Sequence, residues 1–153
     1  MRSLVLIAAF VAVPSSIVNS MNVTPDTSIY ETSEWSLIAM MPERIVALDL
    51  ASLKPIEHSG DTLVTIWVEE TYLDPEPGQP SSARFQVVND CKSGRFQLVE
   101  SAYYRRPYAG GTSHSGRQYY LKDAIERLET PVEKSIGAIQ LEVTCSTPHD
   151  EQA

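Results

Sequence analysis

The sequence has few of the residues on which metal and catalytic sites are commonly built. Its 153 residues include only two cysteines and three histidines. His58, His114 and His149 are far apart in the chain, and no H-x-H or H-E-x-x-H spacing could bring two imidazoles onto one metal ion. We therefore expect solvated histidines in turns and in the tail, no metal ion and no cofactor.

Other catalytic signatures are absent as well. The sequence has no G-x-S-x-G nucleophile elbow and no dinucleotide fingerprint, and Gly110-Gly111-Thr112 lacks the lysine of a phosphate-binding loop. Asp49, Glu69 and Glu70 are conceivable as an acid and a base, but adjacent strand residues point to opposite faces of a sheet. We expect solvated charges here and a protein that is not an enzyme. A hydrolase without a recognisable motif is the weaker alternative.

The chain also lacks an excess of basic residues and a long apolar run. Twelve lysines and arginines stand against twenty aspartates and glutamates, which gives a net charge of −8. This balance argues against nucleic acid or an anionic membrane surface as the main partner. The apolar run at residues 4–13 is well short of the roughly 20 residues that a membrane-spanning helix needs, so no integral membrane span is expected.

That apolar run is instead typical of a secretory signal peptide. It follows Arg2 and leads into a short stretch of small and polar residues, so we expect residues 1–20 to be the signal, cleaved between Ser15 and Ser20. Residues 21–33 are mostly polar and are expected to be a flexible entry segment. Residues 147–153 are expected to be a disordered tail. The predicted location is periplasmic or secreted.

This location decides how the two cysteines are interpreted. In an oxidising compartment a cysteine pair is by default a disulfide. Cys91 and Cys145 lack the C-x-x-C spacing of a redox-active pair, so we expect a structural bond between them.

The rest of the chain shows short apolar runs bounded by proline, glycine, aspartate and serine, a pattern typical of strands joined by turns. Thr62–Glu70 is apolar on both faces and is expected at the centre of a sheet. Pro55 should lie at an edge or a strand end, because it has no N–H to donate. Cys91 is expected to point inward beside Phe85 and Val87. The other predicted strands are Trp35–Met40, Arg44–Leu50, Ser52–Glu57, Ala83–Cys91, Arg95–Tyr104 and a return at Arg117–Leu121, with long loops at Asp74–Ser82 and Pro107–Gly116.

The last element can be interpreted in two ways. Thr130 as N-cap, Pro131 at the first helical position and Glu133 as capping partner favour a helix, with Val132, Ile136, Ile139 and Val143 on one face. Against the helix, apolar residues from Ile139 to Cys145 alternate as in a strand, and Gly137 costs a helix interior about 1 kcal/mol. We favour the helix.

In their order and spacing, these features resemble the bacterial surface-adhesin protein E family. The resemblance covers about residues 35–145. It rests on Trp35, Asp49 with Ser52, the Gly60-Asp61 turn, Trp67, Asp90-Cys91, Pro131, Ser135 and Val143-Thr144-Cys145. It implies a six-stranded antiparallel sheet with a C-terminal helix held on its concave face by the Cys91–Cys145 disulfide.

We therefore predict an α+β domain over residues 34–146, with one antiparallel sheet of about six strands and a C-terminal helix tied to one face by a disulfide. The resemblance implies a non-enzymatic binding or envelope-associated module. Its partners would be extracellular or envelope proteins, and a homodimer is a further option. The resemblance implies that the member after which the family is named is lipid-anchored through a cysteine. No cysteine follows the apolar run in this chain, so surface display is in doubt. A structural or stress-related periplasmic protein is therefore the alternative.

The best candidate for a contact surface is a cluster of tyrosines and arginines beside the glycine-rich loop. Tyrosine and arginine are enriched in protein interfaces because each combines a wide contact area with a polar or charged end. The alternative is that a tyrosine fills the core and the arginines balance nearby acids. The candidate contact residues are Tyr104, Arg105, Arg106 and Tyr108.

Overall fold

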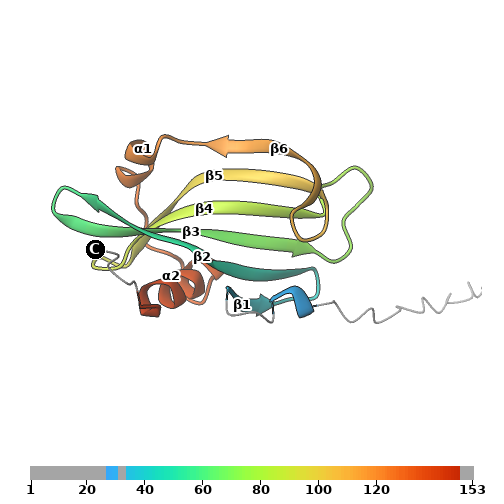
Figure 1. Ribbon diagram of the computed structural model, residues 1–153, viewed down its shortest axis with the longest axis horizontal. Helices are drawn as coiled ribbons and strands as arrows, with labels where there is room; N and C mark the ends of the chain where they lie inside the picture. The colour runs from blue at the N-terminus through green and yellow to red at the C-terminus, as the bar shows by residue number, and fades with distance from the viewer. Residues whose placement is uncertain (1–26, 31–33, 149–153) are drawn as a thin grey trace, which may run out of the picture.

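The body of the protein is a single sheet of six antiparallel strands that follow one another in chain order (Figure 1). The computed structural model describes residues 27–30 and 34–148. The predicted signal peptide, most of the entry segment and the tail from His149 lie outside them. The strands are β1 (Trp35–Met40), β2 (Arg44–His58), β3 (Asp61–Tyr72), β4 (Ser82–Asp90), β5 (Arg95–Arg106) and β6 (Gly110–Gln118).

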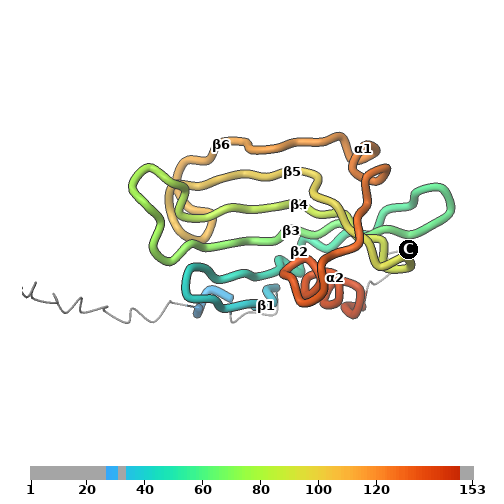
Figure 2. The backbone as a smooth tube through the Cα atoms, turned by 180° about the vertical axis from the view of Figure 1, so that it is seen from behind, coloured from blue at the N-terminus to red at the C-terminus, as the bar shows by residue number. Residues whose placement is uncertain are grey.

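Helical segments cover both faces of this sheet. Helix α2 (Ile136–Ser146) packs Ile136 and Val143 against the largest apolar cluster, and we call this side the α2 face. The other side carries the short helix α1 (Leu121–Ile125) and the 3-10 turn η1 (Ser28–Tyr30), and we call it the α1 face. Figure 2 shows the segment after α1 crossing the strands to reach α2. The predicted fold class is confirmed.

Strand β2 joins two predicted strands into one bent strand. Its pairing with β3 is interrupted between Asp49 and Lys54. There the Ser52 hydroxyl donates to the Asp49 carbonyl at 2.6 Å and accepts the Trp67 N–H at 2.9 Å, so a side chain replaces the missing backbone partner. Pro55 pairs with Val64 of β3 beyond the part of β2 that contacts β1, and its predicted edge position is confirmed.

The region after β5 differs from the prediction. Most of the expected loop at residues 107–116 belongs to β6, and the expected strand at 117–121 is the end of β6 followed by α1. The glycine-rich sequence of β6 shows no alternation of apolar and polar residues, because the strand is at the sheet edge and is exposed over nearly its whole length. Strand β6 is held in place by backbone hydrogen bonds to β5 and does not depend on a row of buried side chains.

Helix α2 confirms the choice of helix, but the predicted start was wrong. Glu129 exchanges two backbone hydrogen bonds with Phe96, at 2.9 and 3.0 Å, which keeps the chain extended where the helix was expected to begin. The helix starts instead at Ile136, and its N-cap is Ser135, whose hydroxyl accepts the Ala138 N–H at 3.2 Å. Val132, expected on the buried helical face, is 78% exposed.

One polar link and one covalent link join α2 to the sheet. The Gln140 amide donates to Asn89 at 2.9 Å, and Asn89 in turn donates to the Val64 carbonyl at 3.4 Å, all in the interior. Cys91 and Cys145 form the predicted disulfide, with their Cα atoms 5.5 Å apart. The expectation that Cys91 points inward was wrong: β4 ends at Asp90, and Cys91 is exposed in the following turn.

Gly137 permits the close approach of α2 to the sheet. A Cβ at this position would lie 2.6 Å from Cζ and 2.9 Å from Cε1 of the Phe96 ring.

We expect Gly137→Ala to lower the free energy of unfolding by about 1–3 kcal/mol, because the overpacking exceeds the gain in helix propensity. Urea unfolding measures this loss. Glu142→Ala, on the exposed side of the same helix, is the control and should change stability by less than about 0.5 kcal/mol. A Gly137→Ala variant as stable as the natural protein would contradict the close contact between Gly137 and Phe96.

Candidate functional site

Part of the α2 face is not covered by α2 and forms a groove beside the β3–β4 loop, residues 73–81. Two adjoining cavities of about 360 Å³ and 630 Å³ lie here. They share four residues of the loop, namely Pro75, Glu76, Gln79 and Pro80. We call the two cavities together the loop groove.

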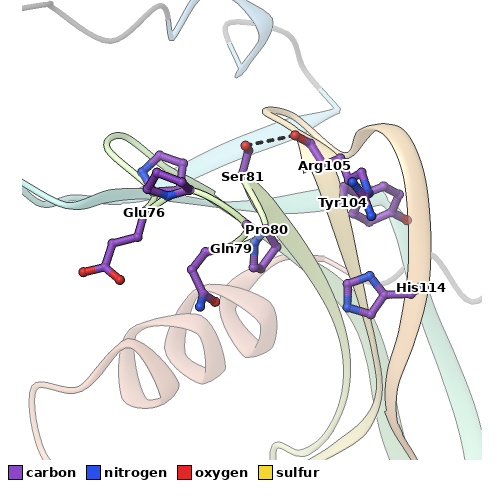
Figure 3. A pocket seen from close by; sticks show the side chains of 10 residues that line it. Glu76, Gln79, Pro80, Ser81, Tyr104, Arg105 and His114 are labelled. Atoms are coloured by element: carbon purple, nitrogen blue, oxygen red, sulfur yellow. Dashed lines mark hydrogen bonds between the residues drawn. The ribbon is translucent and has the colours of Figure 1, made fainter.

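Both ends of the loop are fixed by hydrogen bonds, and at the first end the Leu73 N–H donates to the Glu43 carbonyl at 2.9 Å. The Ser81 N–H donates to the Tyr104 carbonyl at 2.9 Å, and the Ser81 hydroxyl donates to the Arg105 carbonyl at 3.0 Å (Figure 3). Ser82, expected in the loop, is instead fully buried in β4, where its hydroxyl donates to the Arg106 carbonyl and accepts the Ala109 N–H. The proline-rich loop is therefore held at a set distance from the β5–β6 turn.

The smaller cavity contains half of the predicted contact residues. Tyr104 and Arg105 line it together with His114, which Figure 3 shows facing Gln79 and Pro80. His114 was expected in a turn but lies on β6, where its exposed ring stacks on Tyr103 with centroids 5.5 Å apart. The larger cavity adjoins the same loop and is lined by Arg44, Tyr72 and Tyr103.

The other two predicted contact residues lie at the β5–β6 turn outside the groove. Arg106 is exposed and its side chain passes close to Gly110 and Gly111, where a Cβ would lie 3.2 Å or less from it. Tyr108 is half-buried, and its ring packs edge-on against Tyr30 with centroids 5.8 Å apart. Its backbone φ of 57° is in the left-handed region, and its N–H donates to the Thr71 hydroxyl at 3.2 Å.

A buried polar cluster on the α1 face was missed by the sequence analysis. The Tyr30 hydroxyl donates to one oxygen of Glu69 at 2.8 Å, and Nε of Arg84 lies 3.2 Å from the other. Arg84 also contacts Asp49 at 2.9 Å and stacks over the Trp35 ring at 5.4 Å. We call these five residues the Glu69 cluster.

The expected solvation of these carboxylates was wrong for Glu69, which is only 3% exposed. Burial raises the pKa of Glu69, and the hydrogen bond from Tyr30 and the charge of Arg84 offset this only in part. Burial also raises the pKa of Tyr30, which lies in the expected entry segment but is itself buried. The prediction that Glu69 and Glu70 face opposite sides is confirmed, because Glu70 pairs with Arg44 on the other face at 3.1 Å. One signal in the sequence was available, a carboxylate inside the most apolar strand.

The Glu69 cluster fixes η1 and Trp35 to the sheet, and its Tyr30 and Glu69 side chains are buried, 4% and 3% exposed. Within residues 27–30 and 34–148, no group of three or more histidine, cysteine, aspartate or glutamate side chains is placed to hold a metal ion. None of the helices in the described part of the chain is long and apolar enough to cross a membrane. Of the residues selected from the sequence as a contact surface, Tyr104 and Arg105 lie in the loop groove, and Arg106 and Tyr108 lie at the adjoining β5–β6 turn.

Fold and site together define a small α+β domain in which a disulfide ties one helix to an antiparallel sheet and leaves a groove at the uncovered end. The family model described as surface-adhesin protein E matches residues 35–146, and the chain belongs to this family. No curated protein and no solved structure matches the chain.

Proposed function

We propose that this protein is a non-enzymatic, extracytoplasmic protein-binding module. Residues 1–20 would export it, residues 34–146 would form the binding domain, and the product would be periplasmic or secreted. Its membership of the surface-adhesin protein E family supports an adhesin-like role at the envelope. The observation that carries the proposal is the loop groove, in which Tyr104 and Arg105 meet a rigid, proline-rich loop.

The chemistry of this surface suits a protein partner. Arg105 and Arg106 are exposed and make no ion pair with a described residue, whereas Arg44, Arg84 and Arg95 each contact a carboxylate. A partner's aspartate or glutamate could therefore pair with Arg105 and Arg106 without breaking a bond in the domain. The ends of the loop are already fixed by hydrogen bonds, so little conformational entropy is lost when the groove is filled.

The hydrolase alternative gains no support from the geometry. Among the described carboxylates, the one with a raised pKa is that of Glu69. It is 3% exposed and accepts a hydrogen bond from Tyr30. A general acid must reach the bond that is cleaved, and this side chain faces the interior. The structural or stress-related alternative predicts a domain that binds none of the partners tested below.

Binding should depend on the two exposed arginines beside the groove. We expect the full chain to bind at least one purified extracellular-matrix or serum protein in biolayer interferometry. Replacing Arg105 and Arg106 by alanine should weaken that binding about 10- to 30-fold, in the range of interface hot spots. Thermal unfolding should stay unchanged, because within residues 27–30 and 34–148 neither side chain makes an ion pair or packs in an apolar cluster.

The matched control is the double variant Lys54→Ala, Lys134→Ala. It removes the same charge from exposed residues that line neither cavity of the groove. Equal loss of binding in both variants would contradict a specific site. Failure to bind any protein of the panel would favour the structural alternative.

A further inference from the structure

Positive charge is unevenly distributed over the described surface. Three of the described arginines, Arg44, Arg84 and Arg95, each contact a carboxylate within 4 Å. The remaining described arginines make no ion pair, and all of them lie at the end of β5, on β6 or just after α1: Arg105, Arg106, Arg117 and Arg127.

The sequence of this region shows the same asymmetry. Residues 101–122 contain no aspartate or glutamate, although the whole chain has a net charge of −8. The same stretch holds five of the seven tyrosines. The edge of the sheet formed by β6 is therefore basic and aromatic, whereas the protein as a whole is acidic.

Two of these arginines meet at one tyrosine near the α1 end of the edge. The guanidinium carbon of Arg117 lies 5.5 Å from the Tyr119 ring centroid, and that of Arg127 lies 5.4 Å from it. Next to them Tyr120 is 84% exposed and Lys122 is exposed. We call these five residues the Tyr119 patch.

The Tyr119 patch has a rigid base. Tyr119 packs against the apolar cluster of Leu63, Val88, Val99 and Ala124, and its N–H donates to the Val99 carbonyl at 2.7 Å. Each guanidinium group is attracted to the Tyr119 ring, and no carboxylate of the described residues lies within ion-pair distance of either. An anionic group bound by these arginines would supply the missing negative charge, and a guanidinium fork matches a sulfate, phosphate or carboxylate group.

We propose that the Tyr119 patch binds a linear, sulfated polysaccharide. Sulfate groups of the polymer would pair with Arg117 and Arg127, and a sugar ring would stack on the exposed Tyr120 side chain. The bound chain would continue along β6 toward Arg105, because a nine-residue strand extends over about 25–30 Å. Carboxylates adjoin the patch in the fold at Glu100, which pairs with Gln118, and in the chain at Asp123 and Glu126, and they favour a narrow polymer over a wide duplex. The choice of a glycan over single-stranded nucleic acid rests on the extracytoplasmic location proposed above.

The test measures binding of the full chain to fluorescein-labelled heparin by fluorescence anisotropy at several salt concentrations. We expect saturable binding that weakens with salt, and about 10-fold weaker binding for the double variant Arg117→Gln, Arg127→Gln. Tyr120→Ala, which removes an exposed side chain and should fold normally, should weaken binding several-fold. The charge-matched control Lys54→Gln, Lys134→Gln should bind as the unaltered protein does.

Three results would overturn the proposal. They are equal affinity for chemically desulfated heparin, tighter binding of an oligothymidylate of similar charge, and equal loss of binding in the control variant. A chain that binds matrix proteins but not heparin refutes this inference alone. A chain that binds heparin through the patch but no protein of the panel supports it and refutes the proposed protein-binding function alone.

Discussion

Replacing Cys91 and Cys145 together by serine is expected to lower the free energy of unfolding by about 3–4 kcal/mol. The bond joins residues 54 positions apart, and opening it returns that loop entropy to the unfolded chain. A loss of this size is a large fraction of the 5–15 kcal/mol that is typical of small domains. Urea unfolding of the serine variant and of the oxidised protein, followed by circular dichroism, measures the difference.

The structure indicates which part of the molecule is lost first. The fully buried residues of helix α2 are Gln140, Leu141 and Thr144, and the disulfide fixes its last turn to the turn after β4. Without that bond, α2 should open at its C-terminal end, and hydrogen exchange there should rise before the sheet unfolds. The reduced natural chain is the control and should match the serine variant. A serine variant within about 1 kcal/mol of the oxidised protein would contradict the prediction.

The second large effect is expected from Arg84→Met. Methionine keeps much of the side-chain volume but removes the charge that lies against Glu69 and Asp49. Removing one partner of a buried ion pair commonly costs about 3–5 kcal/mol, because the other charge stays buried without compensation. We expect a loss in this range at pH 7. Adding Glu69→Gln to Arg84→Met should restore part of it, and urea unfolding of the double-mutant cycle measures the coupling.

The same cluster should make stability depend on pH in a defined direction. Burial raises the pKa of Glu69 from its ordinary value of 4.5, so the folded protein binds this proton more tightly than the unfolded chain. The contribution of Glu69 to stability is therefore greatest below pH 4.5 and is lost as the pH rises through the raised pKa. Glu69→Gln should remove this pH dependence. A Gln variant whose stability falls over the same pH range as that of the natural chain would show that another group causes it.

Much of the architecture could be predicted because it depends on local patterns. The apolar run Thr62–Glu70 predicted the central strand β3, and proline, glycine and aspartate marked the turns at both its ends. The helix start was misplaced because Thr130-Pro131-Val132-Glu133 has a locally sufficient capping pattern, whereas the pairing of Glu129 with Phe96 is a contact between distant residues. Strand β6 was missed for a similar reason, since an exposed edge strand is specified by its neighbour and not by its own side chains.

The candidate sites also divide into residues that the sequence could select and residues that only the fold brings together. Tyr104, Arg105, Arg106 and Tyr108 were selected from the sequence by residue type alone, and the structure places the first two in the loop groove and packs Tyr108 against Tyr30. The Tyr119 patch and the Glu69 cluster could not be found in this way. Each depends on side chains from separate elements, such as Arg117 on β6 and Arg127 after α1.

The sequence by itself determined the antiparallel sheet, the C-terminal helix and the pairing of the two cysteines, because alternation of apolar residues, turn residues and a cysteine count of two are local or elementary properties. Tertiary structure alone decided which charges are buried, where α2 begins and which arginines lack a carboxylate. These outcomes depend on residues that are distant in the chain and meet only when strand register is set. Glu69 and Glu70 are adjacent in sequence, yet one is buried in the Glu69 cluster and the other pairs with Arg44 on the opposite face.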